Sequence, residues 1–446
     1  MKILPYKLES TNTKLTSQAG LLPLIELMRH LKLSEQINNY FASPKSNRGY
    51  APSCFVELLI LMQHAGHHTL DSVRHFQDDM ALQDVVKFKA VPSPQALGSW
   101  LKKHGANPQS FVAISHINRH LLQCSLHNVK RVTLDIDAFA IESKNESAKW
   151  TYKGHQGYMP MAGHIAETGG LVHVDFREGN VSPKANNMEF IHQCADKLPS
   201  GVCIKYLRID CAGYQEAIFK HCDTHSIQYA IRAMMSQDIR DTIAQASQKD
   251  WEPLVHKNGE LSKTQSHLRT VHCIGSYEKA FTLIIQRKLK KGQGELDVSQ
   301  SKSTSNDELT IGNYVYRAIA TNKDHLSNSA IVHWYNARGE DSENRIKELK
   351  RDLGGQDLPC GSFAANALYM AICVLSYNIL VLMRQLLPAD LATHRASTLR
   401  WKVYLKPAKV VKTGRQILVK LSDKHQYLLS MITQFFLSFH PPPIPW

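Results

Sequence analysis

The sequence lacks the short motifs that mark several large enzyme classes. It contains no P-loop of the form GxxxxGK followed by Ser or Thr, no GxGxxG after an expected strand, no HExxH and no GxSxG. These absences argue against P-loop nucleotide hydrolysis, dinucleotide chemistry on a Rossmann fold, HExxH-type zinc catalysis and esterase-type serine catalysis. Nothing in the residue pattern indicates a nucleophilic serine or cysteine.

The nine cysteines form no CxxC pair and have no regular spacing. An irregular set of odd number indicates reduced thiols, so we expect a cytoplasmic protein. Residues 221–225 read His-Cys-Asp-Thr-His, but no second cluster completes a zinc site, so we expect a structural role for them. A signal-peptide pattern is also missing, because no apolar run follows the lysines of the first ten residues.

Acidic residues are too few to balance the basic ones. Among 446 residues, 39 are Asp or Glu and 53 are Lys or Arg, which gives a formal net charge of +14. Such an excess indicates a polyanionic partner, most commonly nucleic acid. Residues 391–422 contain no acid and have aromatic and aliphatic residues between their cations, a pattern typical of a surface that follows phosphates. The cations of this segment are Arg395, Arg400, Lys402, Lys406, Lys409, Lys412, Arg415 and Lys420.

Only one segment lacks charge over a length that could span a bilayer, residues 361–383. It contains Ser362, Asn366, Ser376 and Asn378, and no second segment of the chain resembles it. In a basic chain with 43% hydrophobic residues, a helix buried in a protein core explains this run better than a membrane span does. We therefore expect no membrane partner.

The spacing of apolar residues changes along the chain. Residues 1–128 have helical spacing, and helices near 71–79 and 95–104 predict either a helix-turn-helix-like unit or part of an ordinary bundle. From residue 129 the order is strand, hairpin, helix, strand, helix and strand, which is typical of a mixed α/β sheet of ribonuclease H-like type. The predicted domains are a helical DNA-binding domain at 1–128, a catalytic domain in two parts at 129–234 and 326–390, a β-rich insertion at 235–325, and a basic C-terminal segment at 391–446 with a disordered tail.

Two aspartates occupy positions in expected strands where functional groups gather. Asp210 ends the strand YLRID, and the carboxyl ends of strands in open α/β sheets carry functional groups. Asp137 lies in the first strand of the α/β region, where Asp135 shares its face and remains an alternative. With a third carboxylate, such a pair can bind two Mg²⁺ or Mn²⁺ ions roughly 4 Å apart, one activating the attacking oxygen and one stabilising the leaving oxygen.

The stretch YNARGEDSENRIKELK can supply the third carboxylate. Glu343, Lys347 and Lys350 are four and three residues apart, which places them on one face of a helix. Tyr335 and Arg338 lie just upstream, ahead of the expected start of that helix. A carboxylate among such residues can hold a metal ion beside a phosphodiester while the cations bind neighbouring phosphates. A solvated, charge-rich helix is the alternative interpretation.

Several blocks together resemble the DDE transposases of bacterial insertion sequences, in the group marked by a Tyr-Arg-Glu-Lys signature. The blocks are LDIDAF, YKGHQGYMPMAGHIAETGGLVHVDFREGN, LRIDCAGY, YNARGEDSENRIKELK and FAANALYMAICVLSYNIL, so that the likeness covers about residues 20 to 420. The resemblance implies a ribonuclease H-like catalytic domain with a β-rich insertion between the second Asp and the Glu. It also implies cut-and-paste transposition by a dimeric complex with paired DNA ends.

The resemblance implies roles for individual residues. The metal-binding and catalytic triad would be Asp137, Asp210 and Glu343. The contacts to phosphates at the DNA ends would fall to Tyr335, Arg338 and Lys350, with Lys347 on the same helix face. Trp251 resembles an insertion-domain Trp that stacks on an extruded base in relatives, and a packed core Trp is the alternative.

One departure from the family's spacing concerns Glu343. The usual signature has three residues between its Arg and its Glu, whereas four separate Arg338 from Glu343 here. Glu340 is a rival, because a lysine follows it at the same interval, but the block ENRIKELK favours Glu343. We expect the extra residue to lie in a turn that Gly339 permits, just ahead of the helix that carries Glu343.

These observations predict a Mg²⁺-dependent DNA transposase, with Mn²⁺ as a possible substitute. It would hydrolyse the phosphodiester at each transposon end and use the 3′-hydroxyl to attack target DNA. Its partners would be the inverted-repeat ends and target DNA, which it would engage as a homodimer. A nuclease of the same fold that cuts without strand transfer and a catalytically inactive DNA-binding protein are the alternatives, and the complete triad argues against the second.

Overall fold

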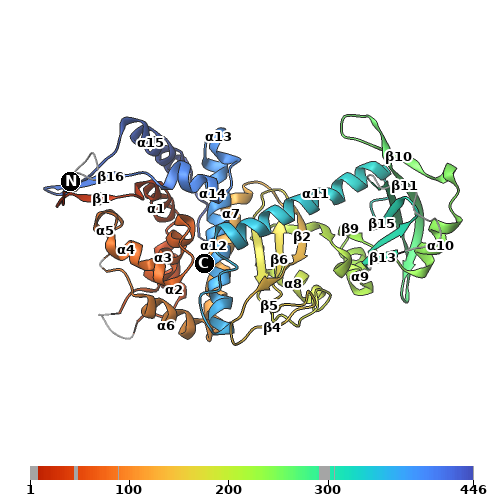
Figure 1. The fold of residues 1–446 in the computed structure, drawn as a ribbon, viewed down its shortest axis with the longest axis horizontal. Coiled ribbons are helices and arrows are strands. Elements are labelled where there is room, and N and C mark those ends of the chain that lie inside the picture. The colour runs from red at the N-terminus through yellow and green to blue at the C-terminus, as the bar shows by residue number, and fades with distance from the viewer. Residues whose placement is uncertain (1–8, 45–48, 89, 291–301, 306, 445–446) are drawn as a thin grey trace, which may run out of the picture. The chain divides into compact units, whose positions relative to one another are not determined.

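The computed structural model of the chain describes residues 9–44, 49–88, 90–290, 302–305 and 307–444 (Figure 1), with the backbone alone at 302–305 and 340–341. The chain divides into two units. The first comprises Met1–Ser125, Asn145–Ser147 and Lys347–Trp446, and the second comprises Leu126–Lys144 and Ala148–Ile346. Helices α1 to α6 therefore share a unit with the C-terminal hundred residues, while the domain boundaries expected at 128, 234, 325 and 390 stay predictions.

Helix α12, Phe363–Leu386, forms the centre of the first unit. Helices α3, Pro52–Ala65, and α6, Pro94–Gly105, pack against it. The approach of α6 depends on Gly105, since a Cβ atom there would lie 2.3 Å from the carbonyl oxygen of Ala364. Among the described residues α12 is the one helix long and apolar enough to cross a membrane, but 89% of its most apolar window is buried inside the protein.

The polar residues of α12 are buried and hydrogen-bonded. The amide of Asn366 donates to the carbonyl oxygen of Cys360 at 2.7 Å, and that of Asn378 donates to the Oδ1 atom of Asn118 at 2.6 Å. Buried polar groups are satisfied in this way inside a folded protein. The expectation of a core helix at 361–383 is confirmed.

The remaining elements of the first unit are short helices and one small sheet. Its three strands have the order β1-β16-β17. The strands are β1 (Lys14–Thr16), β16 (Ala408–Thr413) and β17 (Gln416–Lys420). The helices are α1 (Leu22–His30), α2 (Leu33–Tyr40), α4 (Arg74–Asp78), α5 (Met80–Val86), α7 (Pro108–Leu126), α13 (Ala389–Ala392), α14 (Ala396–Leu399) and α15 (Asp423–Ser438), with π-helical turns at Glu348–Asp352 and Arg400–Tyr404. Pro442 in the predicted disordered tail accepts a hydrogen bond from His120, and residues 445–446 of that tail lie outside the described part.

A mixed sheet of eleven strands organises the second unit. Its path is β10-β11-β12-β15-β9-β8-β2-β6-β7, with β14 on β15 and β13 on β14. Strands β2, β8 and β9 are parallel to one another, β6 pairs antiparallel with β2, and β7 pairs antiparallel with β6. The strands are β2 (Arg131–Ala138), β6 (Met161–Ile165), β7 (Leu171–Asp175), β8 (Cys203–Ile209), β9 (Gln228–Arg232), β10 (Glu252–Val255), β11 (Leu261–Ile274), β12 (Tyr277–Leu289), β13 (Lys302–Ser305), β14 (Glu308–Ile311) and β15 (Tyr314–Thr321).

The expected order of elements from residue 129 to 232 is confirmed. Strand β2, the β6–β7 hairpin with Gly169 in its turn, helix α8 (Asn187–Lys197), β8, helix α9 (Glu216–Thr224) and β9 follow one another as predicted. A small sheet of order β3-β5-β4 lies between β2 and β6 in the chain, with strands Ile141–Glu142, Gln156–Tyr158 and Lys149–Trp150. The strands between 252 and 321 extend the large sheet, because β15 pairs with β9.

Strand alternation divides the second unit into layers. At β2, Ile136 pairs with Gly163 of β6, and a Cβ atom on Gly163 would lie 2.7 Å from Cys194 of α8. Asp135 and Asp137 point to the opposite face, which helix α11, Asn328–Lys347, covers. Further along, α11 packs its apolar residues on β9, β12 and β15 in a buried cluster formed by Ala230, Leu254, Ile284, Ile319, Ile331, Val332 and Tyr335.

Candidate active site at the ends of two parallel strands

Asp137 and Asp210 are neighbours at the carboxyl ends of adjacent parallel strands. Ile136 of β2 pairs with Ile209 of β8, and each aspartate is the next residue along its strand. The spacing of paired strands is about 4.8 Å, so the two carboxyl groups leave the sheet side by side. The Oδ1 atom of Asp210 accepts a hydrogen bond of 2.9 Å from the backbone N–H of Ala212, which orients this carboxyl group.

Burial and charge both act on the Asp137 carboxyl group. Its pKa is raised to about 6, with burial as the largest cause and the negative charge of Asp210 acting in the same direction. The cations of Arg338 and Lys153 oppose this rise. Two carboxylate charges this close repel one another, and a cation placed between them removes that repulsion. The electrostatics of this site therefore favour a bound cation.

Arg338 is the internal counterion of Asp137. Its Nη2 atom lies 3.5 Å from the Oδ1 atom of Asp137 and donates a 2.8 Å hydrogen bond to the carbonyl oxygen of Ile136. The Nε atom of Arg338 is buried and has no hydrogen-bond partner among the described residues. A buried guanidinium with one unused donor beside two carboxylates is suited to bind an anionic oxygen such as that of a phosphate.

Asp135 has different contacts from Asp137, although both face α11. Arg208 of β8 donates two hydrogen bonds to the Asp135 carboxylate, each 2.6 Å long, and a third to the carbonyl oxygen of Trp334 on α11. Asp135 is 0% exposed and Arg208 is 3% exposed, so this ion pair is removed from solvent. Burial raises the pKa of Asp135 and the Arg208 charge opposes the rise. These contacts indicate a structural role for Asp135.

His164 of β6 and Ser342 of α11 complete this buried network. The Nε2 atom of His164 lies 3.1 Å from the Ser342 hydroxyl and 3.6 Å from Asp135. Burial and the nearby arginines, Arg345 first among them, lower the pKa of His164 well below its usual value, so the imidazole is neutral. Residue pattern alone assigned no role to Arg208 or His164, because nothing in their local sequence shows which strands become neighbours. Ser342 was expected as a possible helix cap, but it lies inside α11.

Helix α11 runs without interruption through Gly339. The expectation of a turn at Gly339, with Tyr335 and Arg338 ahead of the helix, is wrong. Glycine lowers helix propensity by about 1 kcal/mol, but Tyr335, Arg338 and Ser342 are all buried against the sheet and hold this segment helical on both sides of it. Tertiary packing therefore overrides the local preference.

The regular helix keeps Glu343 away from the two aspartates. Five residues of α-helix rotate a side chain by about 500°, which leaves Glu343 about 140° around the axis from Arg338. Glu343 is exposed, and among the described side chains no group of three or more His, Cys, Asp or Glu is arranged to hold a metal ion. The structure thus brings Asp137 and Asp210 together with Arg338 but not with Glu343, and the side chain of the rival Glu340 lies outside the described part.

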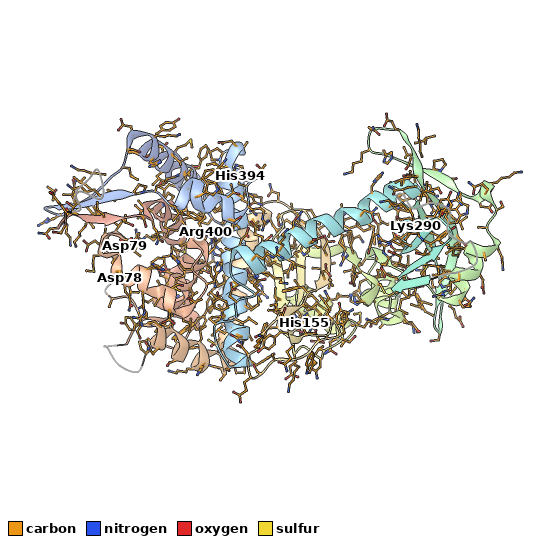
Figure 2. All side chains as sticks on the ribbon, in the orientation of Figure 1. Asp78, Asp79, His155, Lys290, His394 and Arg400 are labelled. Atoms are coloured by element: carbon orange, nitrogen blue, oxygen red, sulfur yellow. The ribbon has the colours of Figure 1, made fainter. Side chains whose placement is uncertain are left out.

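A basic pocket of about 810 Å³ lies beside the strand ends, between the sheet and α11. Six of its lining residues are Lys or Arg and two are Glu. The cations are Arg232, Arg287, Lys288, Lys290, Arg317 and Arg338, of which Lys290 is labelled in Figure 2. Tyr335 and Glu343 line it as well. The guanidinium of Arg232 lies 5.1 Å from the Tyr335 ring centre, and its buried Nη1 atom has no hydrogen-bond partner in the described part of the chain. The pocket is therefore suited to a polyanion.

The other residues predicted to contact DNA have varied surroundings. Trp251 is 8% exposed, with the Arg287 guanidinium 4.3 Å from its ring centre and the Tyr316 ring 5.7 Å away. Lys347 is the last residue of α11, and Lys350 lies in the π-helical turn that follows in the first unit. Their contacts with DNA stay predictions.

Two residues near the carboxylates were not assigned a role from the sequence. Tyr152 and Lys153 follow β4, inside the block YKGHQGY. Burial raises the pKa of the Tyr152 hydroxyl, and the charges of Asp210 and Asp137 raise it further, while Lys153 acts on Asp137. Tyr152 is 65% exposed, so its ring stands at the surface next to the two carboxyl groups. The sequence signal for Tyr152 and Lys153 was their place in the block YKGHQGY, which resembles a block of the family.

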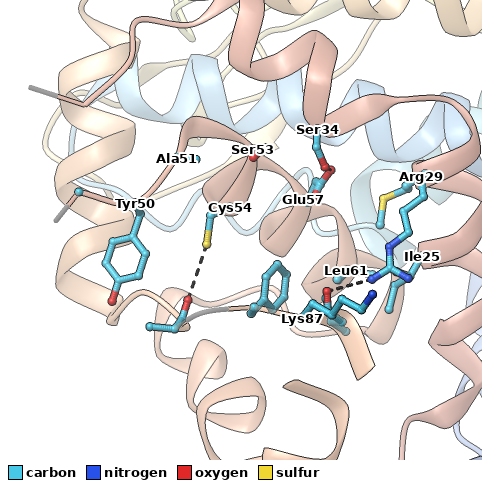
Figure 3. A pocket seen from close by; sticks show the side chains of 15 residues that line it. Ile25, Arg29, Ser34, Tyr50, Ala51, Ser53, Cys54, Glu57, Leu61 and Lys87 are labelled. Atoms are coloured by element: carbon cyan, nitrogen blue, oxygen red, sulfur yellow. Dashed lines mark hydrogen bonds between the residues drawn. The ribbon is translucent and has the colours of Figure 1, made fainter. Parts of the chain in front are cut away.

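A second pocket, of about 570 Å³, lies in the first unit beside α1 and α3 (Figure 3). The Ser34 hydroxyl donates to Glu57, whose carboxyl pKa is raised by burial. Burial also raises the pKa of the Cys54 thiol to about 12, so the thiol stays protonated at neutral pH. Arg29 is engaged by the carbonyl oxygen of Val86 at 3.0 Å. This pocket offers neither a thiolate nor paired carboxylates.

The fold and the site define an α/β protein whose acidic strand ends open beside a basic pocket. Residues 5–436 match the family model described as transposase DDE domain group 1. Because this match covers nearly the whole chain, the protein belongs to that family of DDE transposases. The chain is also similar to the piggyBac transposase synaptic complex with hairpin DNA, with 10% identity and a TM-score of 0.45 over 96% of this chain and 83% of that one. The comparison with curated proteins found no match.

Proposed function

We propose that the protein is a DNA transposase that cleaves the ends of a transposon and joins them to target DNA by cut-and-paste. The observation that carries the proposal is the pair Asp137 and Asp210 at adjacent strand ends in a chain of the DDE family. The strand order β7-β6-β2-β8-β9, with β6 antiparallel and β8 and β9 parallel to β2, supports a ribonuclease H-like catalytic core.

The donor set at the strand ends fits Mg²⁺ or Mn²⁺. Both ions prefer oxygen ligands, and the Asp137 and Asp210 carboxyl groups supply them at a point where burial and mutual repulsion favour a cation. When bound, such ions would lower the pKa of the attacking water or hydroxyl and stabilise the leaving oxygen. Asp135 is a poorer donor, because Arg208 already occupies both of its carboxylate oxygens.

The chain's own cations would position the DNA. Arg338 has an unused buried Nε donor next to Asp137, and the pocket cations continue from it along β12 and β15. Charged groups of this kind bind the oxygens of successive phosphates and so place one phosphodiester at the carboxylates. We assign Tyr335, Arg338, Lys347, Lys350 and Trp251 to DNA contacts on the family resemblance, with two copies of the chain acting on paired ends.

Glu343 is the proposed third carboxylate, and it requires a local change in α11. A single π-helical turn between Arg338 and Glu343 would absorb one residue and rotate Glu343 toward the position that Ser342 occupies. Gly339 is exposed in this segment, and a Cβ atom there would meet no described atom within 4 Å, so Gly339 itself does not oppose the change. The change would displace the buried Ser342 from its contact with His164. DNA or metal binding would supply the free energy for the change.

The test uses purified full-length protein, Mg²⁺ or Mn²⁺, and DNA carrying the inverted repeats that flank the gene. We expect Asp137→Asn and Asp210→Asn to abolish cleavage while retaining DNA binding, and the exposed Asp238→Asn to cleave like the parent. Glu343→Gln should also abolish cleavage, whereas Glu340→Gln should not. Cleavage by Asp210→Asn at the parental rate would refute the assignment.

The same preparation distinguishes the alternatives. Recovery of joined products in a plasmid-integration assay would exclude a nuclease without strand transfer. Sequence-specific binding without cleavage in either metal would favour the inactive DNA-binding protein. Light scattering of the complex with end DNA should give two chains per assembly.

A further inference from the structure

A small sheet in the first unit carries cations that the proposed active site does not use. Strands β16 and β17 form a hairpin through Gly414, whose φ of 58° suits the tight turn. One face of the sheet is anchored to the unit: Thr16 donates a 2.5 Å hydrogen bond to Asp79 (labelled in Figure 2), Lys14 pairs with Asp84, and Val410 is 5% exposed. The opposite face is open.

The basic segment at 391–422 divides into an inward set and an outward set of cations. Arg395 pairs with Asp352, and Arg400 donates to the carbonyl oxygens of His64 and Asp352. Lys402 bonds to His394, which Figure 2 labels together with Arg400. Lys406 donates to the carbonyl oxygen of Trp401 at 3.0 Å. These cations therefore hold the unit together rather than meeting an external partner.

The outward set lies on the hairpin and consists of Lys409, Lys412, Arg415 and Lys420. All four are exposed. Lys412 contributes with Lys14 to lowering the pKa of Asp84, and none of the four forms an ion pair with any described residue. Lys409, Arg415 and Lys420 are thus free to meet a polyanion, while Lys412 shares the anchored face with Val410 and Lys14.

Two of these lysines stand directly opposite each other on the open face. Lys409 of β16 pairs in register with Lys420 of β17 and, on its other side, with Leu15 of β1, which is 57% exposed. Leu418, 41% exposed, lies two residues from Lys420 on the same face. Like charges directly opposite one another destabilise a pair of strands. The free protein therefore retains an unfavourable pair that no acid relieves.

Protection of an exposed sheet edge does not account for the pair. Lysines on edge strands discourage the addition of a further strand, and that explains Lys420 on β17. Lys409 lies on β16, the central strand of the sheet, where no edge needs protection. A polyanion on this face would convert the repulsion into two attractive contacts.

We propose that the open face of the β1-β16-β17 sheet, with Lys409, Lys420 and the hairpin tip at Arg415, binds the phosphate backbone of duplex DNA apart from the active site. This inference rests on the proposed function, since DNA is its partner. From Lys420 to Arg415 the strand extends about 17 Å, and duplex DNA carries about ten phosphate charges over that length. Contacts from lysine to phosphate carry no base information, so this surface holds DNA of any sequence.

The test measures the salt dependence of binding by full-length protein to a fluorescent duplex of unrelated sequence, without divalent cations. For Lys409→Gln/Lys420→Gln, the slope of log Kobs against log salt should become shallower by about 1.8, and affinity near 0.1 M salt should fall roughly ten- to sixtyfold. Lys409→Arg/Lys420→Arg should bind like the parent. The control Lys130→Gln/Lys257→Gln, which removes two exposed lysines outside the segments predicted to bind DNA, should change neither quantity.

A thermal unfolding measurement without DNA separates binding from folding. Removal of the opposed charges should leave the Gln variant at least as stable as the parent. An unchanged salt slope, an equal loss in the Lys130→Gln/Lys257→Gln control, or a loss of affinity that follows a lowered Tm would overturn the inference.

Failure of this inference is distinguishable from failure of the proposed function. If the Gln variant binds like a parent that cleaves end DNA, the hairpin surface is not a DNA contact and the transposase assignment stands. If the parent does not bind duplex DNA at any salt concentration, both proposals fall. If Asp137→Asn binds DNA like the parent but does not cleave it, a loss of DNA affinity in Lys409→Gln/Lys420→Gln does not come from damage to the active site.

Discussion

Asp135 and Asp137 lie two residues apart on one strand, yet their replacement by Asn should have different consequences. Asp135→Asn places an amide N–H₂ against the guanidinium donors of Arg208 and leaves that cation, 3% exposed, without its counterion. Breaking a buried ion pair from one side costs about 3–5 kcal/mol. For a unit of roughly 200 residues, each kcal/mol lowers Tm by about 2–4 °C, so the expected loss is about 6–20 °C.

Asp137→Asn should lower Tm far less than Asp135→Asn does, because its 3.5 Å contact with Arg338 is looser than the bidentate Arg208 pair and Arg338 keeps its hydrogen bond to the carbonyl oxygen of Ile136. The Asp137 pKa is raised to about 6, with burial as the largest cause, so the ionised carboxylate is less stable in the folded protein than in the unfolded chain at neutral pH. An amide removes that unfavourable charge. The same substitution removes a proposed metal ligand, so cleavage should be lost while the fold persists.

Thermal unfolding followed by circular dichroism, together with the cleavage assay, reads out both effects. A second substitution, Arg208→Gln in the Asp135→Asn background, makes the pair neutral and should recover most of the lost Tm. The reasoning is refuted if Asp135→Asn unfolds like the parent but does not cleave, because Asp135 would then be the ligand. It is equally refuted if Asp137→Asn loses stability as Asp135→Asn does.

Four further predictions concern Asp137, Gly339 and Gly105. The pKa of Asp137 is about 6 in the folded protein against an ordinary value of 3.8. This group therefore stabilises the folded state fully below pH 3.8, and the stabilisation disappears as the pH rises through 6. Urea unfolding of the metal-free parent should show this loss of stability with rising pH, and urea unfolding of Asp137→Asn should not. In the cleavage assay, activity should fall below about pH 6 as Asp137 becomes protonated. Gly339→Ala should raise Tm through a helix-propensity gain of about 1 kcal/mol and slow cleavage, because it stiffens the segment that must rotate Glu343; equal or faster cleavage would contradict this. Gly105→Ala should lower Tm, because its Cβ atom would lie 2.3 Å from the Ala364 carbonyl oxygen and force α6 away from α12. Overpacking of this kind costs about 1–3 kcal/mol. An unchanged Tm would show that the two helices separate freely.

Local periodicity determined much of the second unit. The strands at 131–138 and 203–209, the hairpin around Gly169 and the helix at 187–197 follow from alternation, turn residues and helical spacing, which act over a few residues. The position of Asp210 at a strand end was readable for the same reason. The buried helix at 361–383 was recognisable from its length and its lack of charge.

Partners distant in sequence determined the rest. Alternation places Asp135 and Asp137 on one face, but only the pairing of β2 with β8 brings Arg208 to the first and Asp210 alongside the second. The continuation of α11 through Gly339 depends on packing against the sheet, which no window around Gly339 contains. A sequence specifies which face a side chain takes, because that depends on neighbouring residues. Tertiary structure decides which charge that side chain meets there, because the charge comes from strands and helices many residues away. For the same reason, only the tertiary structure separates the inward from the outward cations of residues 391–422.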